Sequence, residues 1–192
     1  RRTHDYLEHY VRVTSSSTIN IRRTTYSVPS RLIGEKLRVH LYDDNLKIYS
    51  GHIHLLTLKR VYVGKNRNGR LIDYQHVIHS LIRKPGAFRY SKIRDNLLPS
   101  EDYKQIWLHA DKTLAAKEAS KYIVQLLFLA ANHNCEPALG RYVLNCFLQT
   151  HMLPKIDHCQ KRYIVPIQEI PKVISHQHQL SSYNQLLTAR TT

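Results

Sequence analysis

Short stretches of alternating apolar and polar residues occupy the first third of the chain. β-Branched apolar residues recur at every second position over residues 11–13 and 19–21, on either side of a run of three serines. A period of two with β-branched residues is typical of strands, so this pattern predicts a hairpin. Beyond Arg23 the apolar positions shift from odd to even numbers. Because such a shift moves side chains to the opposite face, it predicts a bulge or a tight turn near residues 22–25.

The clearest hairpin pattern follows directly. Aliphatic and polar residues alternate over 37–41, an Asp-Asp-Asn sequence occupies 43–45, and the alternation resumes over 46–49. One face of this hairpin is aliphatic and is expected to pack inward. A further pair of strands is expected over 53–58 and 60–63. Five or six short strands with one apolar face are expected to close into a small barrel, because closure removes exposed strand edges.

Helical patterns fill the second half of the chain. Asp73 can cap a first helix that the Pro-Gly pair at 85–86 would end, and Ser-Glu-Asp at 100–102 is typical of a second helix start. Asp111 can cap the longest helix. Glu-Pro at 136–137 begins another, since proline suits the first helical position. The last two helices are predicted to form a helical hairpin.

These patterns predict an α+β fold with three parts. Residues 1–70 are expected to form a small N-terminal β-barrel and residues 71–153 an α-helical assembly region. Two prolines are expected to keep residues 154–192 as an extended tail, which a short amphipathic element ends. The candidate partner-binding residues of this element are Leu180, Tyr183, Leu186 and Leu187. Tails of this kind are usually frayed termini, and the alternative is a partner-binding peptide that orders on contact.

Charge changes the functional picture. The chain carries 29 Lys and Arg against 14 Asp and Glu, a formal net charge of +15, with a pI near 9.9. The excess lies mainly in residues 1–104, with 20 basic and 9 acidic residues, against 9 and 5 in residues 105–192. A strongly basic surface attracts polyanions, so nucleic acid is the expected partner. A globular domain with an unusual surface is the alternative.

The candidate DNA contacts are cations at strand spacing with tyrosines between them. Such cations can follow a phosphate backbone, and tyrosines can bond to phosphate or stack on exposed bases. The predicted set on the barrel is Arg12, Arg22, Arg23, Tyr26, Arg31, Arg38, Tyr42, Lys47, Tyr49, Lys59 and Arg60. A second basic pair, Arg83 and Lys84, lies at the end of the first helix, where cations also complement the helix dipole. Some of the strand cations can alternatively serve to prevent edge aggregation.

Other functional classes find little support in the residues. No C-x-x-C or H-E-x-x-H spacing accompanies the 13 histidines and three cysteines, so no metal site is expected. The sequence has no G-x-S-x-G or P-loop, and its acids lie at expected turns and caps, so we predict no catalytic residue and no cofactor. Unpaired cysteines and the lack of a long apolar run indicate a cytoplasmic protein without a membrane partner.

Three segments together resemble the C-terminal part of IstA-type insertion-sequence transposases: SSSTINIRRTTYSVPSRLIGEKLRVHLYDD, DYQHVIHSLIRKPGAF and RDNLLPSEDYKQIW. The resemblance covers residues 1–187. In that family, helix-turn-helix segments come first and an RNase H-like domain with an Asp-Asp-Glu metal triad comes next. A Mu-transposase-like β-barrel and a helical region come last. The resemblance implies that this chain is the non-catalytic part, with divalent metal expected only in the missing catalytic domain.

The resemblance also implies partners. The barrel would contact transposon-end and target DNA, the helical part would contact other transposase subunits, and the C-terminal region would contact the AAA+ helper ATPase. One departure is Leu58, which stands where related barrels often have a histidine two residues before the arginine. Two other functions stay open: a protein-interaction module that docks the ATPase without significant DNA binding, and a stand-alone nucleic-acid-binding barrel, for single strands in particular.

Overall fold

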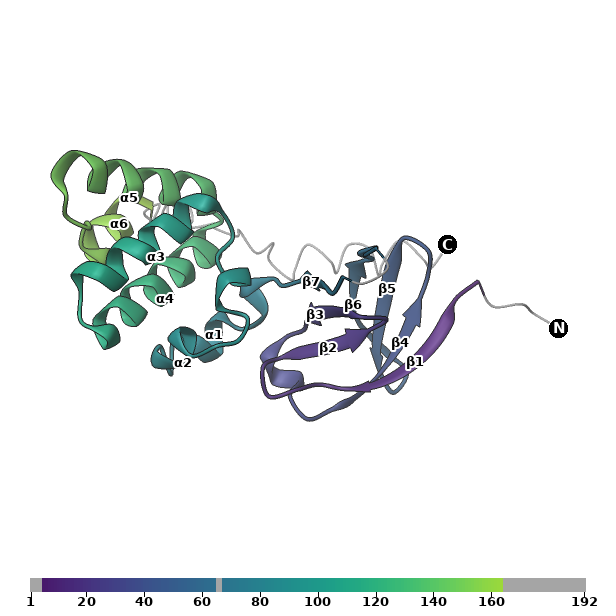
Figure 1. Cartoon of the computed structure of the whole chain (residues 1–192). Coiled ribbons are helices and arrows are strands. Elements are labelled where there is room, and N and C mark those ends of the chain that lie inside the picture. Colours follow the sequence, from purple (N-terminus) through teal and green to yellow (C-terminus); the bar gives the residue numbers. More distant parts are fainter. Residues whose placement is uncertain (1–4, 65–66, 164–192) are drawn as a thin grey trace, which may run out of the picture.

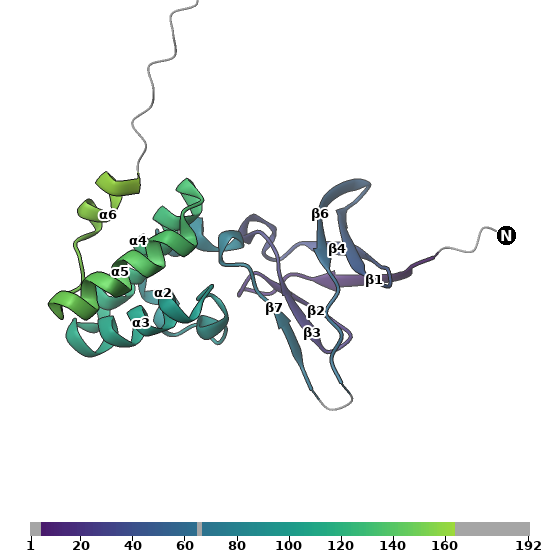
Figure 2. The same cartoon turned by 90° about the horizontal axis from the view of Figure 1, so that it is seen from above.

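The computed structural model describes residues 5–64 and 67–163, which form a strand region followed by a helical region (Figure 1). The two regions lie side by side in both views, and the chain passes from one to the other after the last short strand (Figure 2). Each region has its own cluster of buried residues. Leu71 packs against the strand cluster and Ile72 against the helical one. The fold is therefore a mixed α+β arrangement with two cores.

The larger sheet has four antiparallel strands in the order β1-β4-β5-β6. Its strands are β1 (Leu7–Arg12), β4 (Lys36–Leu41), β5 (Asn45–Ser50) and β6 (Ile53–Lys59). The β4–β5 hairpin confirms the prediction over residues 37–49, with Leu41 opposite Leu46 and Val39 opposite Ile48. A register shift beside Tyr49 marks a bulge between β5 and β6.

The second sheet has three strands, β2 (Thr18–Ile21), β3 (Thr24–Ser27) and β7 (Gly69–Leu71), in the order β2-β3-β7. β2 and β3 are antiparallel and joined by Arg22 and Arg23, which confirms the predicted tight turn. β7 adds to β3 in parallel. Within the described ranges the strands form these two sheets and no closed barrel, so closure of the expected barrel is not seen.

Two strand pairings differ from the sequence-based expectation. β1 does not form a hairpin with β2; it pairs with β4, and hydrogen bonds between Val13 and residues 34–35 extend that ladder. Ser17, with φ of 58°, then redirects the chain into the other sheet. Residues 60–63, expected to be a strand, run irregularly, because their first amide groups bond to Asp44 and to the hydroxyl of Tyr26. Alternation indicates strands but does not choose their partners.

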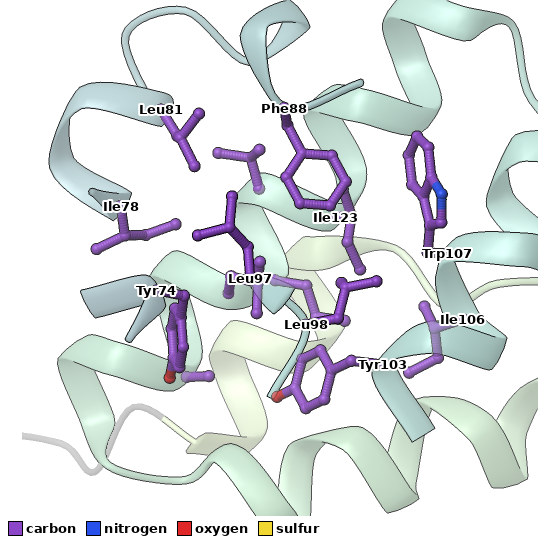
Figure 3. Packing of buried hydrophobic residues seen from close by; sticks show 14 of the residues in the cluster. Tyr74, Ile78, Leu81, Phe88, Leu97, Leu98, Tyr103, Ile106, Trp107 and Ile123 are labelled. Carbon is purple, nitrogen blue, oxygen red and sulfur yellow. The ribbon is translucent and has the colours of Figure 1, made fainter. Parts of the chain in front are cut away.

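The helical region contains six α-helices and two 3-10 turns among the described residues. The α-helices are α1 (Ile78–Leu81), α2 (Gly86–Arg89), α3 (Glu101–Thr113), α4 (Ala116–His133), α5 (Glu136–Thr150) and α6 (Ile156–Tyr163). The 3-10 turns are η2 (Tyr74–His76) and η3 (Arg94–Asn96), and a further one, η1 (Ser30–Leu32), belongs to the strand region. α3, α4 and α5 pack together around a core that includes Phe88, Trp107 and Tyr103 (Figure 3).

Three helix predictions have different outcomes. Asp73 is confirmed as a cap, since its carboxylate accepts a hydrogen bond from the Gln75 amide, but it caps the 3-10 turn η2. The helix expected to run to the Pro-Gly pair is broken instead: α1 ends at Leu81, and Gly86 begins α2. Asp111 is not a cap: it lies inside α3, and its carboxylate accepts a hydrogen bond from the Arg89 guanidinium instead. The predicted helical hairpin is confirmed by α4 and α5, which meet at Asn134 in the left-handed conformation.

The tail prediction requires a correction. Residues 156–163 form α6 rather than an extended segment, because its apolar positions find partners on α4 and α5. Cys159 is fully buried, and the Tyr163 hydroxyl donates to the carbonyl of Ala138 at 3.0 Å. The Tyr122 hydroxyl similarly donates to the carbonyl of Pro154 at 3.0 Å. The predicted amphipathic element with Leu180 lies outside the described residues.

Candidate nucleic-acid interface

The outer face of the four-stranded sheet brings together cations from β1, β4, β5 and β6. Residues directly opposite in neighbouring strands point to the same face, and the inward residues of β4, such as Val39, are fully buried. Arg12 lies opposite Lys36, Tyr10 opposite Arg38, and Asn45 opposite Lys59. The basic residues of this face, here called the sheet face, are Arg12, Lys36, Arg38, Lys47 and Lys59. Within the four strands the single acid is Glu8.

Aromatic rings lie between these cations. The ring centroids of His40 and Tyr49 are 4.7 Å apart, and those of Tyr49 and His54 are 5.3 Å apart. The ammonium group of Lys47 lies 5.0 Å from the centroid of Tyr42, and the guanidinium of Arg38 lies 5.4 Å from that of Tyr49. These contacts hold the cations against a row of rings that crosses three strands. The sheet face therefore combines positive charge with flat apolar surface.

Glu8 moderates the positive charge at one end of the sheet face. One carboxylate oxygen lies 3.7 Å from the Arg38 Nε and 3.7 Å from the His40 Nε2. Glu8 is well exposed, so water screens these ion pairs and each contributes little to stability. Arg12, Lys36 and Lys59 are exposed at other positions of the sheet face. The sheet face consequently keeps a net positive charge.

Arg22 and Arg23 occupy the tip of the β2–β3 hairpin. Their φ angles are 44° and 65°, so both lie in the left-handed region that a two-residue type I′ turn requires. Asn-Gly and Asp-Gly are the usual residues of such turns, because left-handed backbone costs other residues about 1–2 kcal/mol each. Both arginines are exposed. The turn thus presents two cations at a conformational cost.

Two of the predicted DNA contacts do not belong to the sheet face. Tyr26 is 1% exposed, and its hydroxyl accepts a hydrogen bond from the Val61 amide, so it is a core residue and its inclusion as a DNA contact was wrong. Its burial follows from the shifted phase of β3, which turns Tyr26 toward the core. Arg60 is largely buried: its Nη1 donates to the Tyr42 carbonyl at 2.7 Å and lies 3.7 Å from an Asp43 oxygen. Its guanidinium therefore also serves to anchor the turn after β4.

Arg31 and Arg83, distant in sequence, line one groove between the strand and helical regions. The groove has a volume of about 740 Å³ and also includes His76 and His79. Ser80 donates a hydrogen bond to Ser30 across it at 2.7 Å. Lys84 lies at the edge of a neighbouring groove of about 420 Å³ that the serine-rich turn borders. The predicted second basic pair is therefore split between two grooves.

His76, which also lines this groove, links the strand and helical regions. Its Nδ1 lies 2.9 Å from the Ser27 hydroxyl, and Ser27 accepts a further hydrogen bond from the Asp73 amide at 2.8 Å. Partial burial lowers the pKa of His76, which the nearby Asp73 carboxylate partly opposes. The imidazole is therefore mainly neutral at neutral pH, and it acts as a structural link.

Several surface residues were not predicted from the sequence. Lys36 lies directly opposite Arg12. It stands two residues before Arg38 and therefore on the same face of the strand, which is the signal that could have identified it. Tyr62 is 67% exposed and Tyr10 is 69% exposed, although aromatic residues are usually more buried. Tyr62 lies in the irregular segment after β6, where no periodicity marks its exposure. Tyr10 extends the aromatic surface of the sheet face beside Arg38, whereas Tyr62 lies beside Arg60.

The described residues offer little for catalysis or metal binding. Among them no group of three His, Cys, Asp or Glu side chains is placed to hold a metal ion. Burial raises the pKa of the Cys159 thiol to about 11, which keeps it protonated and poorly nucleophilic at neutral pH. No helix in the described part is long and apolar enough to span a membrane. The positive charge gathered on the sheet face attracts polyanions.

Comparison with known proteins points to a transposase-associated domain. Residues 4–65 match the family described as Mu transposase, C-terminal domain. That domain is a non-catalytic part of transposases, and the match supports a Mu-like transposase C-terminal region. Over 188 residues the chain is 35% identical to the "Uncharacterized protein y4jA/y4nE/y4sE" of Sinorhizobium fredii (strain NBRC 101917 / NGR234). The alignment covers 97% of this chain and 37% of that relative, so the chain spans little more than a third of its length. No solved structure matches the chain.

Proposed function

We propose that this chain is the non-catalytic C-terminal part of an IstA-type DDE transposase and that it binds DNA through the sheet face. The observation that carries this proposal is the gathering of five cations and several aromatic rings on one side of the four-stranded sheet. The match to the Mu transposase C-terminal domain covers the same strands, which supports the assignment.

Binding would be dominated by phosphate contacts. Lysine and arginine side chains that neutralise phosphates release counterions, which makes affinity fall steeply with salt and depend weakly on sequence. Arg12, Lys47 and Lys59 come from three different strands, so together they can follow a phosphate backbone across the sheet. The turn arginines Arg22 and Arg23 and the groove arginines Arg31 and Arg83 would extend the interface beyond the sheet face.

The remaining parts would contact proteins. We propose the division into a DNA-binding strand region (1–70), a helical assembly region and a C-terminal tail that contacts the AAA+ helper ATPase. The exposed Leu108, Leu148 and Met152 on and beside α3 and α5 support a protein-contact role for the helical region, since exposed apolar residues often mark interfaces. Transposon ends, target DNA and other transposase subunits would be the partners, in the cytoplasm.

A salt series with matched variants tests the DNA interface. Affinity for a duplex would be measured for the chain, for the triple variant Arg12→Ala, Lys47→Ala, Lys59→Ala, and for a control triple variant. The control replaces Lys112, Lys117 and Lys121 with alanine; these residues carry the same total charge and are exposed, but they lie on α3 and α4. The sheet-face variant should lower the slope of log affinity against log salt by about 0.9 for each phosphate that is no longer neutralised.

The control separates local binding from net charge. Both triple variants remove three positive charges, so an effect of overall charge would weaken binding equally in the two. Equal slopes in the two variants would therefore contradict a DNA-binding sheet face. Absence of duplex binding even at low salt, with firm binding to the helper ATPase, would favour the alternative protein-interaction module.

A further inference from the structure

A small pocket opens beside the β2–β3 turn and is separate from the sheet face. It lies between Arg22 and the irregular residues 60–63, and Arg60 and Tyr62 also line it. Its volume is about 180 Å³, whereas sites for drug-sized molecules usually have about 300–1,000 Å³. The pocket therefore suits one chemical group of a larger ligand. Arg22 and Arg60 both carry a positive charge, which favours an anionic group, and in nucleic acids that group is phosphate.

The Arg60 guanidinium is held in place while keeping its charge. Its Nη1 donates to the backbone carbonyl of Tyr42 at 2.7 Å, and a neutral carbonyl does not cancel the positive charge. The Asp43 carboxylate lies 3.7 Å away and is fully exposed, so water screens its attraction for the guanidinium. The pocket thus has one fixed cation from Arg60 and one exposed cation from Arg22.

Tyr62 forms a fixed aromatic surface that lines the pocket. Its hydroxyl donates to the Asp43 backbone carbonyl, and the Arg60 guanidinium carbon lies 4.4 Å from the ring centroid. The residue is nevertheless 67% exposed. Exposed aromatic rings beside cations are the surfaces on which unpaired bases stack, because every base has a flat π-face. A paired base in a duplex does not offer that face.

The backbone of the turn is held firmly in its strained form. The Gly69 amide donates to the Arg23 carbonyl at 3.1 Å, which ties the turn to β7. A Cβ atom on Gly69 would lie 2.8 Å from Val63 Cγ1 and 2.9 Å from Thr24 Oγ1, so β7 approaches the turn as closely as glycine permits. Strained residues that the surrounding structure holds in place are concentrated at functional sites. Here one of the strained residues, Arg22, supplies a cation of the pocket.

We propose that this pocket binds one phosphate of a DNA strand whose adjacent base is unpaired, with Arg22 and Arg60 contacting the phosphate and Tyr62 stacking on the base. The inference rests on the proposed function, because it assumes that the chain binds DNA. It adds a preference among DNA structures that the sheet face alone does not supply. Intact duplex would occupy the sheet face, and a strand end or gap would fill the pocket as well.

A comparison of the chain's affinities for two DNA structures tests the inference. Affinities of the full chain would be measured at one salt concentration for an intact duplex and for the same duplex with a three-nucleotide single-stranded overhang. Stacking of one base contributes about 1–3 kcal/mol, so the overhang duplex should bind about 5-fold to 150-fold more tightly. Tyr62→Ala should abolish this preference and leave affinity for the intact duplex within about twofold.

Further variants distinguish the parts of the pocket. Tyr62→Phe keeps the ring and removes the hydrogen bond to Asp43, so it should keep most of the preference and also serve as a folding control. Arg22→Ala should weaken binding of the overhang duplex more than Arg22→Lys does. Tyr90→Ala, at an exposed tyrosine outside the pocket, should change neither affinity.

The outcomes separate this inference from the proposed function. Equal affinities of the chain for the two DNA structures, or a preference that persists in Tyr62→Ala, would overturn the pocket assignment while salt-dependent duplex binding still stood. If the unmodified chain bound neither DNA structure, both the pocket assignment and the proposed function would be overturned. An overhang preference that disappears in Tyr62→Ala and persists in Tyr62→Phe and Tyr90→Ala would establish the pocket.

Discussion

The strand region and the helical region bury their hydrophobic residues in different ways. The strand region buries a cluster of 11 hydrophobic residues and the helical region one of 22. In a strand every second side chain faces outward, so four paired strands present a continuous polar face opposite a small core. In the helical region the packed stripes of several helices share one larger core. The strand region is therefore better suited to carry an extended charged surface, and the helical region has the larger core.

The two regions also use left-handed residues for different purposes. In the helical region Asn134 and His151 follow the ends of α4 and α5, where the His151 amide bonds back to Phe147 at 2.7 Å. Such residues satisfy the last carbonyls of a helix. In the strand region Arg22 and Arg23 adopt the same conformation at a hairpin turn. The left-handed conformation thus ends helices in the helical region and places two exposed cations at a turn in the strand region.

Deleting a core side chain from each region tests whether the two cores are separate, and it should give the largest effect. Phe88 is fully buried and packs edge-on against Trp107, with centroids 5.0 Å apart, so Phe88→Ala should lower the free energy of unfolding by about 3–5 kcal/mol. Ile48→Ala should cost the strand region about 2–5 kcal/mol. Trp107 is the single tryptophan, so its fluorescence reports the helical region. The Ile48 variant should leave the Trp107 unfolding transition in place, and an equal shift in both variants would show one cooperative unit.

A glycine in the helical region sharpens the comparison of packing. A Cβ atom on Gly140 of α5 would lie 2.8 Å from the Tyr103 ring, whose hydroxyl is bonded to the Glu136 carbonyl and cannot easily move. Gly140→Ala should therefore destabilise the chain by about 1–3 kcal/mol through overpacking. Gly86→Ala is the matched control, because a Cβ there meets nothing within 4 Å. Thermal unfolding followed by circular dichroism would measure both, and a stabilised Gly140 variant would contradict the close approach of α3 and α5.

Replacing the turn arginines tests the cost of charge display in the strand region. The double variant Arg22→Asn, Arg23→Gly has the residues that a type I′ turn favours, so it should gain about 1–2 kcal/mol in stability. The same variant should bind DNA more weakly, because two candidate phosphate-binding cations are removed. Chemical denaturation and duplex binding would be measured together. Unchanged stability would argue against strain at this turn, and unchanged affinity would remove the turn from the DNA interface.

The smallest expected effect concerns the junction between the regions. Burial lowers the pKa of His76 below its ordinary value of 6.5, so the unfolded chain binds a proton at this residue more readily than the folded chain does. The stabilisation from neutral His76 is therefore complete above about pH 6.5 and is lost as the pH falls through the lowered pKa. Unfolding measured between about pH 5 and pH 7 should show this loss. His76→Gln should flatten the pH dependence over that range, and an unchanged slope would assign it to other groups.

Local features could be predicted from the sequence better than long-range partners. The 37–49 hairpin, the turn at Arg22 and the Asp73 cap depend on residues close in the chain, and each is present. The partner of β1, the role of Asp111 and helix α6 depend on residues far away, and each was predicted wrongly. Among the candidate DNA contacts, the prediction for Tyr26 was wrong for the same reason. The sequence around an aromatic residue on a strand does not show whether its side chain faces the core or the solvent.

The amino-acid sequence by itself determined where most strands, turns and helices form, and that the strand-rich part carries most of the positive charge. Alternation, turn residues and caps act over a few positions, so they can be read from the chain directly. Only the tertiary structure decided that β1 pairs with β4 to complete the sheet face, that Arg31 and Arg83 share a groove, and that Arg22 meets Arg60 and Tyr62 in one pocket. These juxtapositions join residues about 25 to 50 positions apart, where packing of the whole core, rather than local pattern, sets which side chains meet.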